Sequence, residues 1–132
     1  MSRQAVSFVR RALVADAAIS GSFGVLLLLA AGLLEGLLGV PATLLRYAGL
    51  VLIPFAGLLV YLAKRDTPSP ASIWMVIALN TAWIIASGAL LLSGLVGPSA
   101  LGYAFIIAQA VAVAVFVELQ YVGVRRLTAA VA

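Results

Sequence analysis

The sequence predicts an all-α protein: an antiparallel bundle of four transmembrane helices with both termini in the cytoplasm. Hydrophobic residues make up 65% of the chain and charged residues only 9%, whereas soluble domains are about 45–50% apolar and about 25% charged. The apolar residues form four long runs separated by short turns, and the basic residues gather at one end of the predicted bundle. These observations indicate that residues 1–132 form a single transmembrane domain.

The first two helices are predicted from apolar runs at residues 12–34 and 45–63. A helix rises about 1.5 Å per residue, so about 20 residues cross the roughly 30 Å of hydrocarbon. Asp16 is the only charged interruption between the ends of the first run. Gly36 and Pro41 lie between the two runs, where residues of these types mark a turn.

The third and fourth helices are predicted at residues 72–92 and 101–122. The third contains no charged residue, and the fourth contains Glu118. Residues 66–70 include two prolines, which cannot continue a helix and which bias the preceding residue toward extended backbone. Residues 94–99 combine two glycines with a proline and form the last turn. Because every connection is short, consecutive helices should lie as antiparallel neighbours.

The distribution of basic residues predicts the orientation, because cytoplasmic loops carry an excess of Lys and Arg. With four crossings, both termini and the middle loop lie on one side of the membrane. Of the eight basic residues, Arg46 alone falls on the other side. The remaining seven are Arg3, Arg10, Arg11, Lys64, Arg65, Arg125 and Arg126. We therefore expect both termini to be cytoplasmic.

Several polar or aromatic residues inside the predicted helices are candidates for a binding site. Ionisable side chains within a membrane are costly and usually face the protein interior or a cavity, and the few other polar residues there also need partners. The candidates are Asp16, Ser20, Asn80, Trp83, Ser87, Gln109 and Glu118.

Asp16 and Glu118 lie at similar depths from the cytoplasmic ends of their helices. If the two carboxylates shared one pocket, that pocket would suit proton coupling. Alternatively, Asp16 forms a structural ion pair with Arg125, Lys64 or another cytoplasmic base, and Glu118 extends toward the interface or pairs with Arg10 or Arg11. Ser20 follows Asp16 by four residues and therefore shares its helix face.

Asn80 and Ser87 are seven residues apart and line one side of the third helix. An asparagine at this depth can bond to a neighbouring helix or contact a ligand. Trp83, one turn from Asn80, could pack over a flat ligand or against lipid and core residues. Gln109 and Glu118 are separated by about 180° on the fourth helix at 100° per residue, so both cannot face the bundle core.

A pair of glycines near the end of the first apolar run predicts close helix packing. Gly32 and Gly36 form a GxxxG pattern, which allows the backbones of two membrane helices to approach each other. We expect the first helix to contact a neighbouring helix, or a second copy of the chain, at this pair.

The composition excludes several classes of function. The chain contains no cysteine and no histidine, which removes thiol redox chemistry, thiolate metal sites and imidazole ligands. It also contains no Ser/His/Asp set and no Walker loop. We therefore expect no enzyme activity, no metal and no cofactor. Membrane orientation accounts for the basic residues at the helix ends, so we expect no nucleic-acid partner.

The chain contains the strings RRALVADA at residues 10–17, IALNTAW at residues 77–83 and ELQY at residues 118–121, followed by Arg125-Arg126. These strings resemble a group of small bacterial integral membrane proteins with four helices, of the domain-of-unknown-function type. The resemblance implies a bacterial source, a location in the cytoplasmic (inner) membrane and a stand-alone protein of about this length. It implies no activity and no functional residue.

The residues leave three functional hypotheses. The first is a non-enzymatic membrane protein that binds lipid, a small apolar molecule or a partner membrane protein, because packing residues outnumber chemically reactive ones. The alternative is a small proton-coupled transporter or exchanger that uses Asp16, Glu118 and Asn80. The third is a membrane enzyme or a redox-cofactor protein. Four helices enclose only a small site, so a homo-oligomer would suit a transport role.

Overall fold

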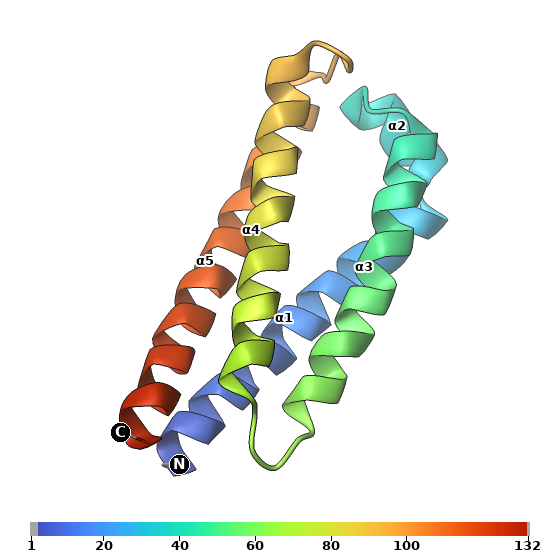
Figure 1. The fold of residues 1–132 in the computed structure, drawn as a ribbon. Coiled ribbons are helices and arrows are strands. Elements are labelled where there is room, and N and C mark those ends of the chain that lie inside the picture. Colours follow the sequence, from blue (N-terminus) through green and yellow to red (C-terminus); the bar gives the residue numbers. More distant parts are fainter. Residues whose placement is uncertain (1–2, 132) are drawn as a thin grey trace.

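The computed structural model describes residues 3–131, which form five α-helices and no strand (Figure 1). The helices are α1 (Arg3–Leu29), α2 (Ala31–Leu38), α3 (Ala42–Ala63), α4 (Pro70–Ser93) and α5 (Ala100–Val131). Four of them, α1, α3, α4 and α5, are long and apolar enough to cross a membrane. The all-helical fold class and the four long apolar helices are therefore confirmed for the described residues.

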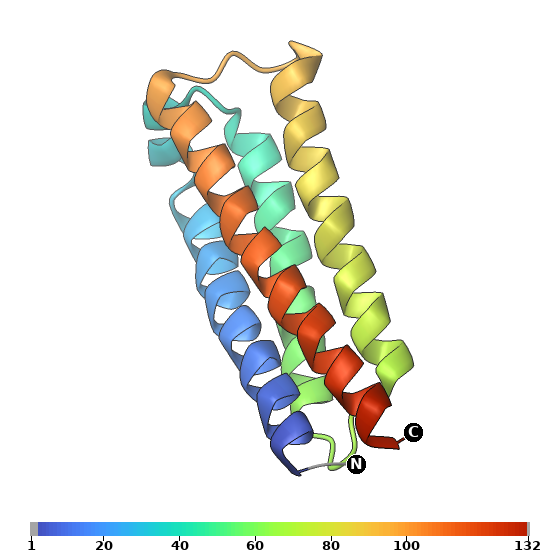
Figure 2. The same cartoon turned by 90° about the vertical axis from the view of Figure 1, so that its left-hand side faces the viewer.

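The long helices lie lengthwise beside one another, and the short helix α2 folds over one end (Figures 1 and 2). The start of α1, the end of α5 and the α3–α4 connection lie together at the opposite end, which we call the basic end after Arg10, Lys64 and Arg125. Helix α1 packs against α3 and α5, and α4 packs against α5. Helices α3 and α4 are consecutive in the chain but scarcely approach each other, and their ribbons diverge away from the basic end (Figure 1).

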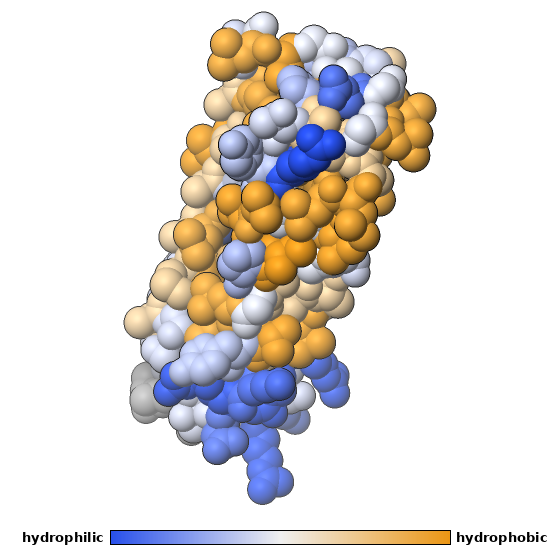
Figure 3. Space-filling model, turned by 90° about the vertical axis from the view of Figure 1, so that its right-hand side faces the viewer, coloured by the Kyte–Doolittle hydropathy of each residue, from blue (hydrophilic) through white to orange (hydrophobic). Residues whose placement is uncertain are grey.

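The outer surface of the bundle is apolar. Hydrophobic residues cover the middle of the face shown in Figure 3, while hydrophilic residues gather at its lower end and in a smaller group near its upper end. Large apolar side chains point outward, including Leu29, which is 84% exposed, and Leu92, which is 90% exposed. Soluble monomers rarely expose extended apolar patches of this kind. The surface instead matches the hydrocarbon of a bilayer, as expected for a multi-pass membrane protein.

The interior contains two apolar clusters. The first lies toward the basic end and includes Leu13, Leu59 and Ile73. The second lies toward α2 and includes Leu27 and Leu52. Along α1 and α4, the buried polar residues fall between these two clusters. Apolar packing therefore encloses the polar part of the interior from both ends.

The first and last helices are longer than predicted. Helix α1 begins at Arg3 rather than at residue 12, and α5 continues to Val131 rather than ending near residue 122. The added turns of α1 are amphipathic, because Val9 is buried while Arg11 is exposed. Such a segment can remain helical beyond the hydrocarbon layer, where hydropathy alone predicts no span.

The predicted first helix is also divided. It breaks at Ala30, and residues 31–38 form the separate helix α2. Within α2, the Oε2 atom of Glu35 accepts a hydrogen bond of 2.8 Å from the backbone nitrogen of Ala42, at the start of α3. The first backbone N–H groups of a helix lack partners, and a carboxylate is favourable there. Glu35 therefore supports the next helix instead of continuing the first.

Helix α2 is fixed to the start of α5. The backbone nitrogen of Ser99 donates to the carbonyl oxygen of Leu38 at 2.9 Å, and its hydroxyl donates to the carbonyl oxygen of Leu37 at 2.8 Å. A Cβ atom on Gly102 would overlap the carbonyl oxygen of Leu38, so the close approach depends on glycine at that position. These contacts hold α2 against α5 at the end of the bundle opposite the basic end.

The predicted contact of Gly32 and Gly36 with a neighbouring helix of the same chain is wrong for the described residues, while contact with a second copy stays a prediction. Neither residue has another part of the described chain within 4 Å of an added Cβ atom. The close crossing lies instead between α1 and α3, where a Cβ atom on Gly49 would lie 2.7 Å from the carbonyl oxygen of Gly24. Glycines let these two backbones approach each other, and this contact holds α1 and α3 together.

Candidate functional site

Four polar side chains meet inside the bundle, and we call them the polar cluster: Asp16 and Ser20 of α1, Asn80 of α4 and Gln120 of α5. Asp16 and Gln120 are each 1% exposed, and Asn80 is 4% exposed. Burying a polar group costs free energy unless its hydrogen bonds are satisfied. The bonds within the cluster therefore decide what it can bind.

Asp16 is the centre of the polar cluster. Its Oδ1 atom accepts a hydrogen bond of 2.9 Å from the Ser20 hydroxyl. Its Oδ2 atom accepts bonds from the side-chain nitrogens of Asn80, at 2.9 Å, and Gln120, at 2.6 Å. Asn80 also donates to the Oε1 atom of Gln120 at 3.0 Å. One acidic residue thus connects α1, α4 and α5 through bonds that a carboxylate accepts.

All of the donors to Asp16 are neutral. Within residues 3–131, no basic side chain forms an ion pair with this carboxylate. The guanidinium of Arg125 instead lies 5.8 Å from the centroid of the Tyr121 ring, and Lys64 is exposed. The predicted ion pair with Arg125 or Lys64 is therefore wrong for this part of the chain. Neutral dipoles alone contact the formal charge of Asp16.

Glu118 lies apart from the polar cluster. It is exposed on the outer face of α5, whereas Gln120, two residues later, is buried. Two residues correspond to about 200° around a helix, so the two side chains point in nearly opposite directions. The structure does not bring Asp16 and Glu118 together, and the shared carboxylate pocket is absent from the described residues.

Gln120 is the functional candidate that was missing from the predicted set. One signal for it is present in the sequence: Gln109 and Gln120 are eleven residues, or about three turns, apart and share one face of the helix. That face is opposite to Glu118. Choosing between the two faces requires knowing which side of α5 meets α1, and the helix pattern alone does not give that information.

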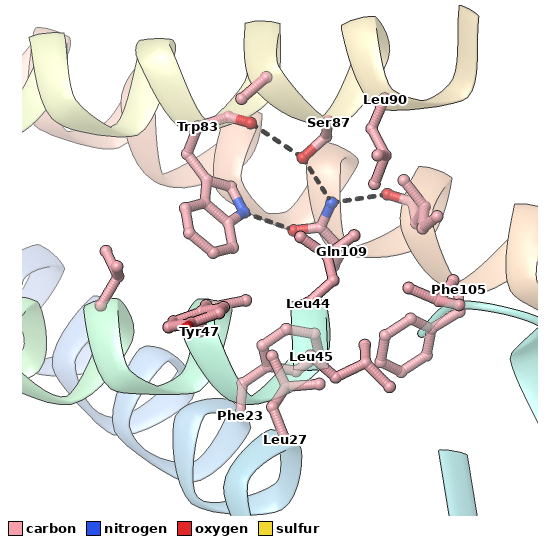
Figure 4. Close-up of a pocket in the computed structure, with 15 residues that line it drawn as sticks. Phe23, Leu27, Leu44, Leu45, Tyr47, Trp83, Ser87, Leu90, Phe105 and Gln109 are labelled. Carbon is pink, nitrogen blue, oxygen red and sulfur yellow. Dashed lines mark hydrogen bonds between the residues drawn. The ribbon is translucent and has the colours of Figure 1, made fainter. Parts of the chain in front are cut away.

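The remaining candidates form a second polar group, made of Trp83 and Ser87 of α4 and Gln109 of α5 (Figure 4). The Oε1 atom of Gln109 accepts a bond of 2.7 Å from the indole nitrogen of Trp83. Its Nε2 atom donates to the Ser87 hydroxyl at 3.0 Å and to the carbonyl oxygen of Ile106 at 2.8 Å. The amide of Gln109 is thus fully engaged within the protein, and it locks α4 to α5.

A cavity of about 310 Å³ lies beside this second polar group, in the half of the bundle toward α2. Its walls are mostly apolar and aromatic (Figure 4). The lining residues are Phe23, Leu27, Val40, Leu44, Leu45, Tyr47, Ala48, Val51, Trp83, Ala86, Ser87, Leu90, Phe105, Ile106 and Gln109. The rings of Phe23 and Phe105 stack with centroids 5.3 Å apart. We call this space the main cavity.

The main cavity opens sideways between α3 and α4. Tyr47 and Val51 of α3 line it and are 64% and 58% exposed. Ala86 of α4 also lines it and is exposed. The backbones of the two helices scarcely approach each other, and these exposed lining residues lie within α3 and α4 rather than in the turns at their ends. The opening therefore faces the apolar surroundings of the helices rather than the end of the molecule.

A second, smaller cavity of about 100 Å³ lies next to the main cavity and shares Val51 and Trp83 with it. Ser20 and Asn80 of the polar cluster line this smaller space, which we call the inner cavity. The two cavities are therefore neighbours that share part of their walls, with one polar group at each.

The arrangement suits binding more than bond-making chemistry. Among the described residues, no group of three or more His, Cys, Asp or Glu side chains could hold a metal ion. Ser20 donates to Asp16, but with no histidine in the chain the pair lacks the relay that activates a serine nucleophile. The cavities instead offer apolar walls and a few fixed polar groups, which is the usual make-up of a small-molecule site.

The fold and the site define a multi-pass membrane protein of four long apolar helices with a lateral, mostly apolar cavity. No protein-family model, curated protein or solved structure matches the chain.

Proposed function

We propose that this chain is a non-enzymatic membrane protein that binds a lipid chain or another small apolar molecule in the main cavity. Its long helices would alternate in direction across a bacterial inner membrane, with both termini cytoplasmic. One observation supports binding above all others: a cavity of about 310 Å³ opens between α3 and α4 onto the apolar surface. A hydrophobic molecule dissolved in the bilayer would reach it without crossing water.

The size and walls of the main cavity support this proposal. Its volume lies at the lower end of the roughly 300–1,000 Å³ of ligand pockets in proteins. It is about twice the ~150 Å³ of an engineered apolar cavity that accommodates benzene. Trp83 and Gln109 satisfy each other's polar groups at 2.7 Å, so these residues present mainly apolar surface to the cavity. A short alkyl chain or a small ring system fits these walls.

Filling the main cavity tests the proposal. Ala86 lines the cavity, whereas Ala89, one turn later in α4, is exposed and lines none of the cavities described above. In Ala86→Phe, the ring should occupy the space and reduce the amount of co-purifying lipid or bound decanol about tenfold, as a loss of about 1.4 kcal/mol would. Ala89→Phe is the matched control and should bind normally. The measurement is native mass spectrometry of the purified protein, together with analysis of the extracted lipids.

Equal binding by Ala86→Phe and the native chain would refute the cavity as the binding site. A protein that purifies without lipid and binds no apolar probe would refute the proposed function altogether. If a second copy or another membrane protein covers the α3–α4 opening instead, the same spectra would show that complex in place of a ligand.

A proton-coupled transporter or exchanger is the second candidate, because Asp16 is buried and has no basic partner among the described residues. It would depend on Asp16 and Asn80 without Glu118, which lies on the exposed face of α5. The test is proton-linked flux in reconstituted vesicles. Loss of this flux in Asp16→Asn, with normal flux in Glu118→Gln, would favour a transporter over simple binding.

A further inference from the structure

The inner cavity lies beside the main cavity and is lined by two residues of the polar cluster. Val51 and Trp83 line both spaces, so a molecule that occupies both would pass these two side chains. The inner cavity has a volume of about 100 Å³, which is too small for a second hydrophobic body but large enough for a small polar head group. The pair of cavities therefore has an apolar part and a polar part.

The polar part offers hydrogen-bond acceptors. Both hydrogen bonds of Asn80 use its side-chain nitrogen, and its side-chain oxygen accepts none from the described residues. Asp16 fixes this orientation, because a carboxylate accepts hydrogen bonds and so must face the nitrogen of the amide. Ser20 uses its hydroxyl hydrogen on Asp16, which leaves lone pairs on its oxygen. Since Ser20 and Asn80 line the inner cavity, the head group that fits best is a donor.

The charge of Asp16 favours a cationic donor. The carboxylate lies directly behind Ser20 and Asn80, at 2.9 Å from each. It is 1% exposed, and no basic side chain of residues 3–131 contacts it. A buried charge that has only neutral partners attracts an opposite charge strongly, because the surroundings screen it little. An anionic head group would be repelled from the same position.

We propose that the two cavities form one site for an amphipathic amine, with its ammonium group against Ser20 and Asn80 and its apolar chain in the main cavity. This inference rests on the proposed function and names the chemistry of its ligand. Ser20 and Asn80 would accept two hydrogen bonds from the ammonium group. Asp16 would act through them as the counter-charge.

Three probes with equal alkyl chains test the inference: decylamine, decanol and decanoate. Their binding would be measured by equilibrium dialysis against the purified protein in nanodiscs of zwitterionic lipid, with empty nanodiscs subtracted. We expect decylamine to bind at least about tenfold more tightly than decanol, a difference that a partly buried opposite charge readily supplies, and decanoate to bind most weakly.

Two substitutions within the polar cluster, with Glu118→Gln as their control, assign the preference to that cluster. Asp16→Asn should make decylamine and decanol bind about equally, with decanol affinity unchanged, because it removes the charge and keeps the shape. Glu118→Gln removes the exposed carboxylate of α5 and should keep the full preference. Ser20→Ala should weaken decylamine binding about threefold by removing one neutral acceptor, so it provides a second test if Asp16→Asn does not fold.

The outcomes separate the two proposals. If native protein binds decanol and decylamine equally, the inference fails while the proposed function stands. An undiminished preference for decylamine in both Asp16→Asn and Ser20→Ala also overturns the inference. If none of the three probes binds, both proposals fail.

Discussion

At the scale of single residues, the site depends on which side of α5 faces inward. Gln120 is 1% exposed, while Glu118 lies on the outer surface. An amide suits the inner position because its nitrogen can donate to Asp16 while its oxygen accepts from Asn80. A second carboxylate in that position would face Asp16 as a like charge and could donate no hydrogen bond when ionised. The polar cluster therefore needs amides around its one acid.

Replacing Gln120 tests this reading of the cluster. Gln120→Met keeps most of the side-chain volume but removes the 2.6 Å bond to Asp16 and the acceptor for Asn80. We expect the free energy of unfolding to fall by about 1–3 kcal/mol, the usual cost of leaving a buried polar group unsatisfied. Thermal unfolding in detergent, followed by circular dichroism, would show it. Glu118→Gln should change stability by less than about 0.5 kcal/mol; an equal loss in both variants would contradict the assignment.

At the scale of helices, the four apolar runs predicted the long helices, but not where each begins and ends. Hydropathy detects the hydrocarbon-spanning part, so it missed the amphipathic first turns of α1, where Val9 is buried. It also missed the division at Ala30, because α2 is as apolar as the helix before it. The hydrogen bond from the backbone nitrogen of Ala42 to Glu35 joins α3 to α2. Neither residue type by itself indicates such a bond, so the sequence did not predict it.

The crossing of α1 and α3 provides a test at this scale. Gly49→Ala places a Cβ atom 2.7 Å from the carbonyl oxygen of Gly24, so the two helices must move apart. We expect a loss of about 1–3 kcal/mol in unfolding free energy, as for other overpacked contacts. Gly57→Ala in the same helix meets no other atom within 4 Å and should be neutral or slightly stabilising, since alanine favours helix. Chemical denaturation in detergent would compare them, and a destabilised Gly57→Ala with an unaffected Gly49→Ala would refute the contact.

At the scale of the whole molecule, the sequence identified most of the polar residues but not how they divide. Asp16, Ser20 and Asn80 meet in the polar cluster, Trp83, Ser87 and Gln109 meet at the main cavity, and Glu118 joins neither group. Which polar residues meet depends on how α4 and α5 are rotated about their axes relative to α1. The sequence does not give this rotation, because each of these helices is apolar on several sides. The opening between α3 and α4 was also not predicted, because a short connection indicates neighbours and not how far they diverge.

The orientation of the bundle decides to which face of the membrane each cavity lies nearer. The basic end carries Arg10, whose guanidinium donates to the carbonyl oxygens of Ala63 at 2.8 Å and Arg65 at 3.1 Å. These bonds tie α1 to the end of α3, where a cation also complements the helix dipole. The opposite end carries Arg46 as its one basic residue. Positive charge at one end is the strongest determinant of which end stays in the cytoplasm.

We therefore expect reporters fused after the C-terminus and within residues 66–70 to be cytoplasmic, and a reporter within residues 94–99 to lie on the other side. Paired enzymatic reporters, one active only inside the cell and one only outside, give opposite signals at each position and so control for expression. Under this orientation Asp16 lies nearer the cytoplasm than Trp83, because Asp16 bonds to Asn80, which is one turn closer than Trp83 to the start of α4 at the basic end. Reporters that place the two ends of the chain on opposite sides would contradict the four-crossing arrangement.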